Sequence, residues 1–152
     1  MSARRFTLDT NLLIYVSDSR DRQKQALAQQ ILAAAATSDC HLSLQSVGEF
    51  YSASVRKKIL LPVHAAREVV SFLTAFPSFP ASAGAHQAAA REAAAGRFSY
   101  WDAVLLASAD EAGCKTCLSE DMTDGARLGG ITVRNPFGPN GLSAAATAAL
   151  AP

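Results

Sequence analysis

Two acidic residues stand where an apolar run ends, a position from which a side chain can reach a ligand. The runs Arg5 to Leu8 and Lys115 to Leu118 each have the length and composition of a short strand. Asp9 directly follows the first run, and Asp121 follows the second by three residues. A carboxylate at such a position can bind a metal ion or accept a proton, although Asp is also common in turns. Neither acid alone distinguishes these roles.

Two further acids are expected in the first turn of a helix. Ser46 and Ser99 each suit the residue that caps a helix, and Glu49 and Asp102 follow them by three positions. This spacing is that of a capping box, in which the carboxylate bonds back to the N–H of the cap residue. An acid in the first turn also gains about 0.3–1 kcal/mol from the helix dipole. A structural role is therefore the simplest explanation of each acid taken alone.

The elements around these acids decide whether the four carboxylates meet. Short β-rich runs alternate with longer stretches that have the composition or the apolar spacing of helices. The expected strands are 5–8, 41–44, 115–118 and 131–134, and the expected helices are 11–16, 23–36, 46–58, one that begins at Pro62, 86–95 and 99–113. Helices between short strands predict an α/β fold of three layers, α/β/α, around a central, mainly parallel sheet. In such a sheet, the carboxyl ends of the strands and the first turns of the following helices share one edge.

All four acids are therefore expected at the carboxyl edge of the sheet. Carboxylates crowded together repel one another, which raises their pKa values and destabilises the fold unless a cation lies among them. A site made of oxygen ligands favours Mg²⁺ or Mn²⁺ over zinc. Such ions can activate a water molecule and stabilise the leaving oxygen of a phosphodiester, while helix N-termini bind the phosphate. The convergence of the four carboxylates thus predicts metal-dependent cleavage of a phosphodiester.

Length and composition limit the class of protein. The chain has 152 residues, of which 49% are hydrophobic and 18% charged, and its formal net charge is +1. These values predict one globular domain with its own hydrophobic core and exclude a disordered chain. No run approaches the roughly 18 apolar residues of a transmembrane helix, and the N-terminal residues lack the apolar segment of a signal peptide. A net charge near zero excludes nucleic-acid binding through overall basicity but leaves room for a local groove.

The cysteines and the C-terminal segment complete this outline. Three cysteines, an odd number, in a chain able to build its own core indicate reduced thiols and a cytoplasmic protein. Cys114 and Cys117 form a lone C-x-x-C on an expected strand, where buried thiols are a better explanation than a zinc or redox site. Residues 138–152 are rich in Ala and Gly, so a flexible tail is expected after a domain of residues 1–137.

Several segments of the sequence resemble the PIN domain, and more narrowly the VapC-type toxins of type II bacterial toxin–antitoxin pairs. The resemblance rests on F-T-L-D-T-N-L-L-I-Y around Asp9, S-V-G-E-F around Glu49, S-Y-W-D-A-V-L-L-A-S-A around Asp102 and C-L-S-E-D-M around Asp121. These segments occur in order within residues 7–137, and I-T-V-R-N-P-F closes the match. Any one of them alone is a weak signal, whereas the set is specific.

The resemblance implies a role for each matching position. The four acids correspond to the metal-binding quartet of the family, and Asp124 to a fifth, more variable acid. Thr10 or Asn11, together with Ser119, correspond to residues that orient the carboxylates without binding the metal themselves. The implied fold is a PIN-like α/β/α domain with a central parallel sheet.

The resemblance also implies an activity and partners. It implies an endoribonuclease that depends on Mg²⁺ or Mn²⁺ and leaves a 5′-phosphate and a 3′-hydroxyl. Members of the family usually dimerise, and a cognate antitoxin holds them inactive by covering the acidic site, often with a basic side chain. For this chain, the implied partners are an RNA substrate, a second copy of the chain, and an antitoxin, expected to be a small DNA-binding protein encoded beside it. No association with a membrane is implied.

Basic residues near the acids in sequence are further candidates for RNA contact. Arg97 lies close to Asp102, and Arg127 follows Asp124 by three residues. Arg134 is a third candidate, although exposed arginines are common and need no ligand to explain them. The run Arg56-Lys57-Lys58 is expected to be the solvated end of a helix, with contact to RNA as the lesser alternative.

Two aromatic residues precede Asp102. Tyr100 and Trp101 could stack on a base, as aromatic side chains do in the recognition of single strands. Residues 101, 104, 105, 108 and 112 share one helical face, however, and this spacing predicts that Trp101 packs in the core.

Three other functions fit part of the pattern. A HAD-type phosphatase also has an Asp after the first strand, but it requires a second acid two residues later, where this chain has Asn11. A phospho-receiver domain requires paired acids after the first strand and a phosphorylatable Asp in mid-chain, and this sequence has neither. A non-catalytic PIN-like module that binds RNA or a protein remains the main alternative. Because all four acids are in place, a metal-dependent endoribonuclease is the preferred prediction.

Overall fold

Short apolar strands form the centre of the molecule in the structure, a computed structural model that describes residues 4–152. The first three residues of the expected 1–137 domain lie outside the described residues. Strands β1 (Phe6–Leu8), β4 (Thr116–Leu118), β6 (Ile131–Arg134) and β5 (Arg127–Leu128) pair in the order β1-β4-β6-β5. The first three are parallel, and β5 runs antiparallel to β6. The prediction of an α/β fold with a mainly parallel sheet is confirmed.

A second, smaller pair of strands extends this arrangement beyond β1. Strands β2 (Leu42–Ser43) and β3 (Ser78–Phe79) are parallel to each other and form a sheet of their own. A single bridge between Phe6 and Cys40 links this pair to β1. The strand expected at 41–44 therefore exists, but it pairs with β3 and is not a full member of the central sheet.

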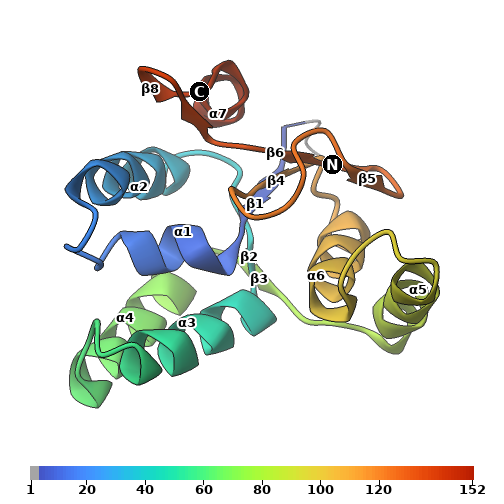
Figure 1. Cartoon of the computed structure of the whole chain (residues 1–152), viewed down its shortest axis with the longest axis horizontal. Helices are drawn as coiled ribbons and strands as arrows, with labels where there is room; N and C mark the ends of the chain where they lie inside the picture. Colours follow the sequence, from blue (N-terminus) through green and yellow to red (C-terminus); the bar gives the residue numbers. More distant parts are fainter. Residues whose placement is uncertain (1–3) are drawn as a thin grey trace.

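Helices cover both faces of the central sheet (Figure 1). The helices are α1 (Thr10–Tyr15), α2 (Arg22–Ala35), α3 (Leu44–Arg56), α4 (Pro62–Ala75), α5 (Ala83–Ala94) and α6 (Tyr100–Glu111). One core cluster joins α5 and α6 to the sheet through Cys117, Ile131 and Val133. The other joins α1 to α4 to the sheet through Phe6 and Leu8. The sheet thus separates two cores, which is the expected three-layer arrangement.

The caps of α3 and α6 set the phase of the acids that these helices carry. Ser99 caps α6 as expected, and its Oγ accepts a hydrogen bond from the N–H of Asp102 at 3.2 Å. Helix α3 instead begins at Leu44, and its cap is Ser43, whose side chain accepts from the N–H groups of the next residues. Glu49 therefore lies in the second turn of α3, and the capping box predicted from Ser46 does not form. The Glu49 carboxylate is therefore not used to cap α3.

The C-terminal segment is structured, in contrast to the flexible tail expected for residues 138–152. Strands β7 (Phe137–Gly138) and β8 (Gly141–Leu142) form a hairpin, and helix α7 (Ala144–Leu150) follows it. Ser143 caps α7 by accepting from the N–H of Ala146 at 3.1 Å, and Ala146 is fully buried. Small side chains allow α7 to lie against α2, so the alanines that suggested a tail provide the packing surface.

The three cysteines are buried and form no disulfide, as predicted. Burial raises the pKa of the Cys114 thiol to about 12 and also raises the pKa of Cys40 and Cys117. All three thiols are therefore protonated at neutral pH and poorly suited to bind a metal or to react. Within residues 4–152, no helix has the length and apolar character needed to cross a membrane.

Candidate active site

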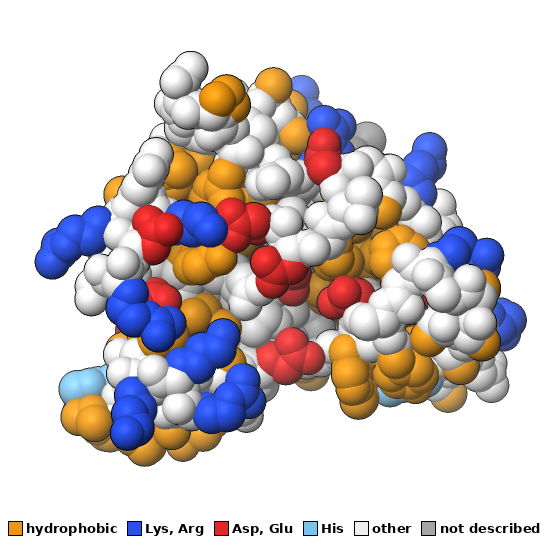
Figure 2. All heavy atoms as spheres, in the orientation of Figure 1, with side chains coloured by type: hydrophobic (Ala, Val, Ile, Leu, Met, Phe, Trp, Pro, Cys, Tyr) orange, Lys and Arg blue, Asp and Glu red, His pale blue; other side chains and the backbone are white. Residues whose placement is uncertain are grey.

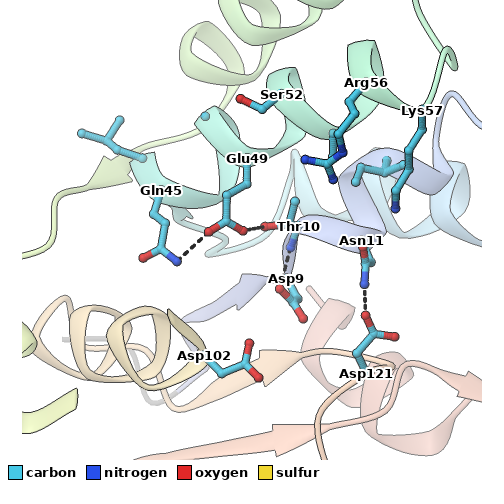
Figure 3. Close-up of a pocket in the computed structure, with 14 residues that line it drawn as sticks. Asp9, Thr10, Asn11, Gln45, Glu49, Ser52, Arg56, Lys57, Asp102 and Asp121 are labelled. Carbon is cyan, nitrogen blue, oxygen red and sulfur yellow. Dashed lines mark hydrogen bonds between the residues drawn. The ribbon is translucent and has the colours of Figure 1, made fainter. Parts of the chain in front are cut away.

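A cleft with a volume of about 710 Å³ opens at the carboxyl ends of β1 and β4. Side chains from α1, α3, α6 and the turn after β4 line it (Figure 3). The structure brings all four predicted acids to this cleft: Asp9, Glu49, Asp102 and Asp121. Figure 2 shows acidic side chains gathered at the centre of one face of the molecule, with lysine and arginine side chains beside them.

Asp9 is the most deeply placed of the four acids. The pairing of β1 with β4 fixes its backbone, because its N–H donates to the carbonyl of Leu118 at 3.0 Å. One carboxylate oxygen accepts from the N–H of Thr10, and the other accepts from the Ser119 hydroxyl, each at 2.7 Å. Burial nevertheless raises the pKa of Asp9, and the negative charges of Asp102 and Asp121 raise it further. A cation beside Asp9 would relieve this unfavourable charge.

Glu49 is held from both sides. Its Oε2 accepts a hydrogen bond from the Thr10 hydroxyl at 2.9 Å, and its Oε1 accepts from the Gln45 side-chain amide at 2.8 Å. Thr10 therefore contacts two of the four acids, because its backbone N–H also donates to Asp9. Gln45, one turn before Glu49 on α3, was not among the residues expected at the site. The spacing of four residues on one helix is the signal that could have indicated it.

The remaining two acids differ in how they are held. The side-chain amide of Asn11 donates to the carboxylate of Asp121. The backbone of Asp102 is fixed by the cap of α6, but within the described part of the chain no group forms a hydrogen bond with its carboxylate. Asp102 thus has both side-chain oxygens available to a ligand, in a cleft that the three other acids also line.

The donor set of the cleft fits a hard divalent cation. It offers carboxylate oxygens with hydroxyl and amide groups behind them, which is the ligand chemistry of Mg²⁺ and Mn²⁺. As the side chains stand in residues 4–152, no three His, Cys, Asp or Glu groups are close enough together to hold an ion between them. Mg²⁺ usually binds one or two carboxylates directly and keeps several waters, so it does not require a closed cage.

Two basic residues also line this cleft, at the end of α3. Gln45, Glu49, Ser52 and Arg56 recur at helical spacing along one face of α3, and Lys57 follows at its end. The run from Arg56 to Lys58 is a solvated helix end, as expected, and two of its three residues also line the cleft. Both Arg56 and Lys57 are exposed, but they belong to the same cavity as the acids (Figure 3).

Other candidates lie away from the cleft. Asp124 is exposed and accepts from the N–H of Asn135 at 2.9 Å and from Arg134 at 3.1 Å, bonds that lower its pKa. Arg97 pairs with Glu92 at 2.6 Å on the surface. Arg127 is exposed on β5 and is not one of the residues that line the cleft.

Trp101 is exposed, so the prediction that it packs in the core is wrong. Its side chain keeps 59% of its accessible surface and meets the ring of Tyr100 edge-on at 5.2 Å. The buried part of α6 begins only at Ala103. Trp101 lies in the first turn of α6, beyond the sheet edge, where the core no longer covers it.

Comparisons with known proteins agree with this architecture. Residues 6–122 match the PIN domain family. No curated protein matches the chain. Among solved structures, the chain is similar to VapC20 of Mycobacterium tuberculosis, a toxin that cleaves the sarcin–ricin loop, with a TM-score of 0.64 and 17% identity over 76% of this chain and 89% of that one.

Two further structures are toxin–antitoxin proteins. VapBC2 from Rickettsia felis, bound to a DNA fragment from its promoter, has a TM-score of 0.61 and 14% identity over 86% of this chain and 98% of that one. A toxin–antitoxin complex from Klebsiella pneumoniae has a TM-score of 0.56 and 25% identity over 86% of this chain and 97% of that one. Because residues 6–122 make up most of the 152 residues, the chain belongs to the PIN domain family.

Proposed function

We propose that this protein is the toxin of a toxin–antitoxin pair and acts as an Mg²⁺- or Mn²⁺-dependent endoribonuclease. The observation that carries the proposal is the cleft in which Asp9, Glu49, Asp102 and Asp121 meet at the carboxyl edge of the sheet. The similarity to VapC20, a toxin that cleaves the sarcin–ricin loop, and to two toxin–antitoxin structures supports the assignment. A cytoplasmic homodimer that also binds an antitoxin is part of the proposal.

All four acids would contribute to the binding of the cation. Asp9 and Asp102 are the principal ligands in this proposal, and Glu49 and Asp121 complete the site or orient water. A divalent cation bound there supplies positive charge for the phosphate oxygens and lowers the pKa of a coordinated water. No His or Lys general base is then required.

The residues behind the acids fix where their oxygens point. Ser119 and the N–H of Thr10 hold one oxygen each of Asp9, while the Thr10 hydroxyl and Gln45 hold those of Glu49. Such bonds reduce the freedom that each carboxylate must lose when it binds a cation, and their removal typically costs about 10- to 100-fold in metal affinity or activity.

A PIN domain that binds RNA or a protein without cutting is the second candidate. The observation that favours it is the spacing of the acids, because no three acidic, His or Cys side chains of residues 4–152 form a ready-made metal cluster. This candidate uses the same cleft but needs no metal for its function. Such a protein would not cut RNA with either ion, and its binding would not depend on Mg²⁺ or Mn²⁺.

Cleavage of total cellular RNA by the purified protein distinguishes the two functions. The reaction is run with Mg²⁺, with Mn²⁺ and with EDTA, for the wild type, for Asp102→Asn and for the control Asp110→Asn. Asp110 lies on the same helix, outside the cleft, and an Asn there can still accept from the N–H of Gly130. We expect metal-dependent fragments from the wild type and the control only. Equal cleavage by Asp102→Asn would show that the metal-site proposal is wrong.

A further inference from the structure

The acidic cleft contains two basic side chains that form no ion pair within the described residues. Arg56 and Lys57 line the same cavity as the four acids. Lys57 contributes to the lowered pKa of Asp18, but Arg20 already pairs with that carboxylate at 2.8 Å. Both cations are therefore available to an anion that enters the cleft.

The spacing on α3 separates these cations from the acids. Glu49 and Arg56 are seven residues apart, which places them on the same face of the helix and about 10 Å apart along its axis. Ser52 and Ala53, which lie between them in the chain, line the cleft with small side chains. The cleft thus has an acidic end near Glu49 and a basic end near Arg56.

This distribution of charge suits an extended polyanion. A phosphate held by the cation proposed at the acidic end lies beside the acids, whereas Arg56 and Lys57 line the other end of the cleft. An RNA strand carries further phosphates on either side of the cut bond and can occupy both ends at once. The chain has a net charge of +1, so attraction to RNA must come from such local cations rather than from the whole molecule.

We propose that Arg56 and Lys57 bind a backbone phosphate of the RNA strand that flanks the phosphate to be cut. The proposal rests on the ribonuclease function proposed above and assigns these two residues a positioning role. They hold the strand along α3 so that the cut phosphate lies over the acids. Arg supplies a planar fork that matches phosphate oxygens, and Lys supplies a point charge, so the contact reads the backbone and not the base.

Binding is measured separately from cleavage, in the Asp102→Asn background so that the RNA stays intact. The probe is a fluorescein-labelled single-stranded RNA, and its anisotropy is followed with Mg²⁺ present between about 50 and 200 mM salt. Arg56→Gln with Lys57→Gln is compared with the control pair Arg67→Gln with Arg91→Gln. The control residues are exposed on α4 and α5, outside the cleft, and their substitution removes the same total charge.

Loss of the two cleft cations should weaken binding by roughly tenfold or more at the lower salt concentration. The slope of log affinity against log salt should become shallower by about 0.7, which is the contribution of one phosphate neutralised on a single strand. The control pair should bind with nearly the wild-type slope. Arg56→Lys alone should keep the slope, since it keeps the charge.

Three results would overturn the phosphate contact. In the first, the Arg56 and Lys57 double variant binds RNA as tightly as its parent, while the wild type cuts RNA. This result would leave the ribonuclease proposal intact. Another is an equal loss in both double variants, which indicates a general effect of charge. The third uses poly-glutamate as a second probe. If the double variant loses binding to poly-glutamate but keeps its binding to RNA, the two cations bind an acidic protein segment. Failure of the wild type both to bind and to cut RNA would overturn this proposal and the proposed function together.

Discussion

The Thr10 hydroxyl donates a hydrogen bond to Glu49 at 2.9 Å, although the two residues lie 39 positions apart in the chain. The backbone N–H of Thr10 also donates to Asp9, at 2.7 Å. Thr10 is the first residue of α1 and is buried, so its own position is fixed by the core. One threonine therefore sets the relative placement of an acid from the end of β1 and an acid from α3.

Thr10→Val should lower the rate of RNA cleavage about 10- to 100-fold. Valine has nearly the same shape but cannot donate to Glu49, so the carboxylate loses one of its two partners while the fold is kept. Initial rates on a labelled RNA at saturating Mg²⁺ test this expectation. Thr10→Ser, which keeps the hydroxyl, should stay close to the wild type, and equal rates for the two variants would contradict the role given to this bond.

Mg²⁺ or Mn²⁺ should stabilise the wild type but not Asp9→Asn. A ligand that binds only the folded state at 100 times its dissociation constant adds about 2.7 kcal/mol, which corresponds to roughly 5–10 °C in Tm. Thermal unfolding with each ion and with EDTA provides the measurement. In EDTA, Asp9→Asn should be at least as stable as the wild type at neutral pH, because burial and the neighbouring acids disfavour the charged form of Asp9. An ion-dependent rise in Tm of equal size in both proteins would place the cation elsewhere.

The free energy of unfolding should fall at alkaline pH in a way that depends on Cys114. Burial raises the pKa of this thiol from 9.0 to about 12. Between these values the unfolded chain has lost the proton and the folded chain has kept it, so stability falls as pH rises. Compared with Cys114→Ala, the wild type should lose about 1.4 kcal/mol more per pH unit in this window. Urea unfolding across this pH window, with neutral pH as reference, tests this. If the free energies of unfolding of the two proteins fell in parallel with pH, the thiol would ionise as easily in the folded as in the unfolded chain.

Two aromatic residues should differ sharply in their importance for stability. Phe50 is fully buried and meets Phe72 edge-on at 5.0 Å, so Phe50→Ala should cost about 3–5 kcal/mol. Trp101→Ala should cost less than about 1 kcal/mol, because most of its ring contacts solvent. Circular dichroism should follow unfolding, since Trp101 is the one tryptophan in the sequence and its variant has no tryptophan fluorescence. A cost for Trp101→Ala near that of Phe50→Ala would mean that its ring is covered in solution.

The convergence of the acids could be predicted because it depends on topology more than on detail. Asp9 and Asp121 follow parallel strands, and the carboxyl ends of such strands share an edge whatever the exact length of each strand. Glu49 reaches the same cleft even though α3 starts at Leu44 and not after Ser46. An error of one turn in a helix boundary still leaves the start of the helix at that edge.

The features that were missed depend on how elements pack against one another. Whether Arg56 faces solvent or the cleft is decided by the rotation of α3 against α1, which the pattern of α3 alone does not contain. Trp101 has the spacing of a core residue but lies before the part of α6 that the sheet covers. Helix α7 is ordered because α2 offers it a surface, and a sequence of alanines does not reveal that surface.

The pairing of β1 with β4 has a consequence for the protein during its own synthesis. Ser119 holds Asp9 from a position 110 residues further along the chain. At about 5–20 residues per second, a ribosome needs several seconds to deliver β4 after β1 has emerged. Until then, the acids lack Asp121 and the Ser119 hydroxyl that holds Asp9, and β1 lacks its neighbour in the sheet. Under the ribonuclease function proposed above, a nascent chain cannot cut the messenger or the ribosome that produces it, and interrupted translation yields fragments without a complete site.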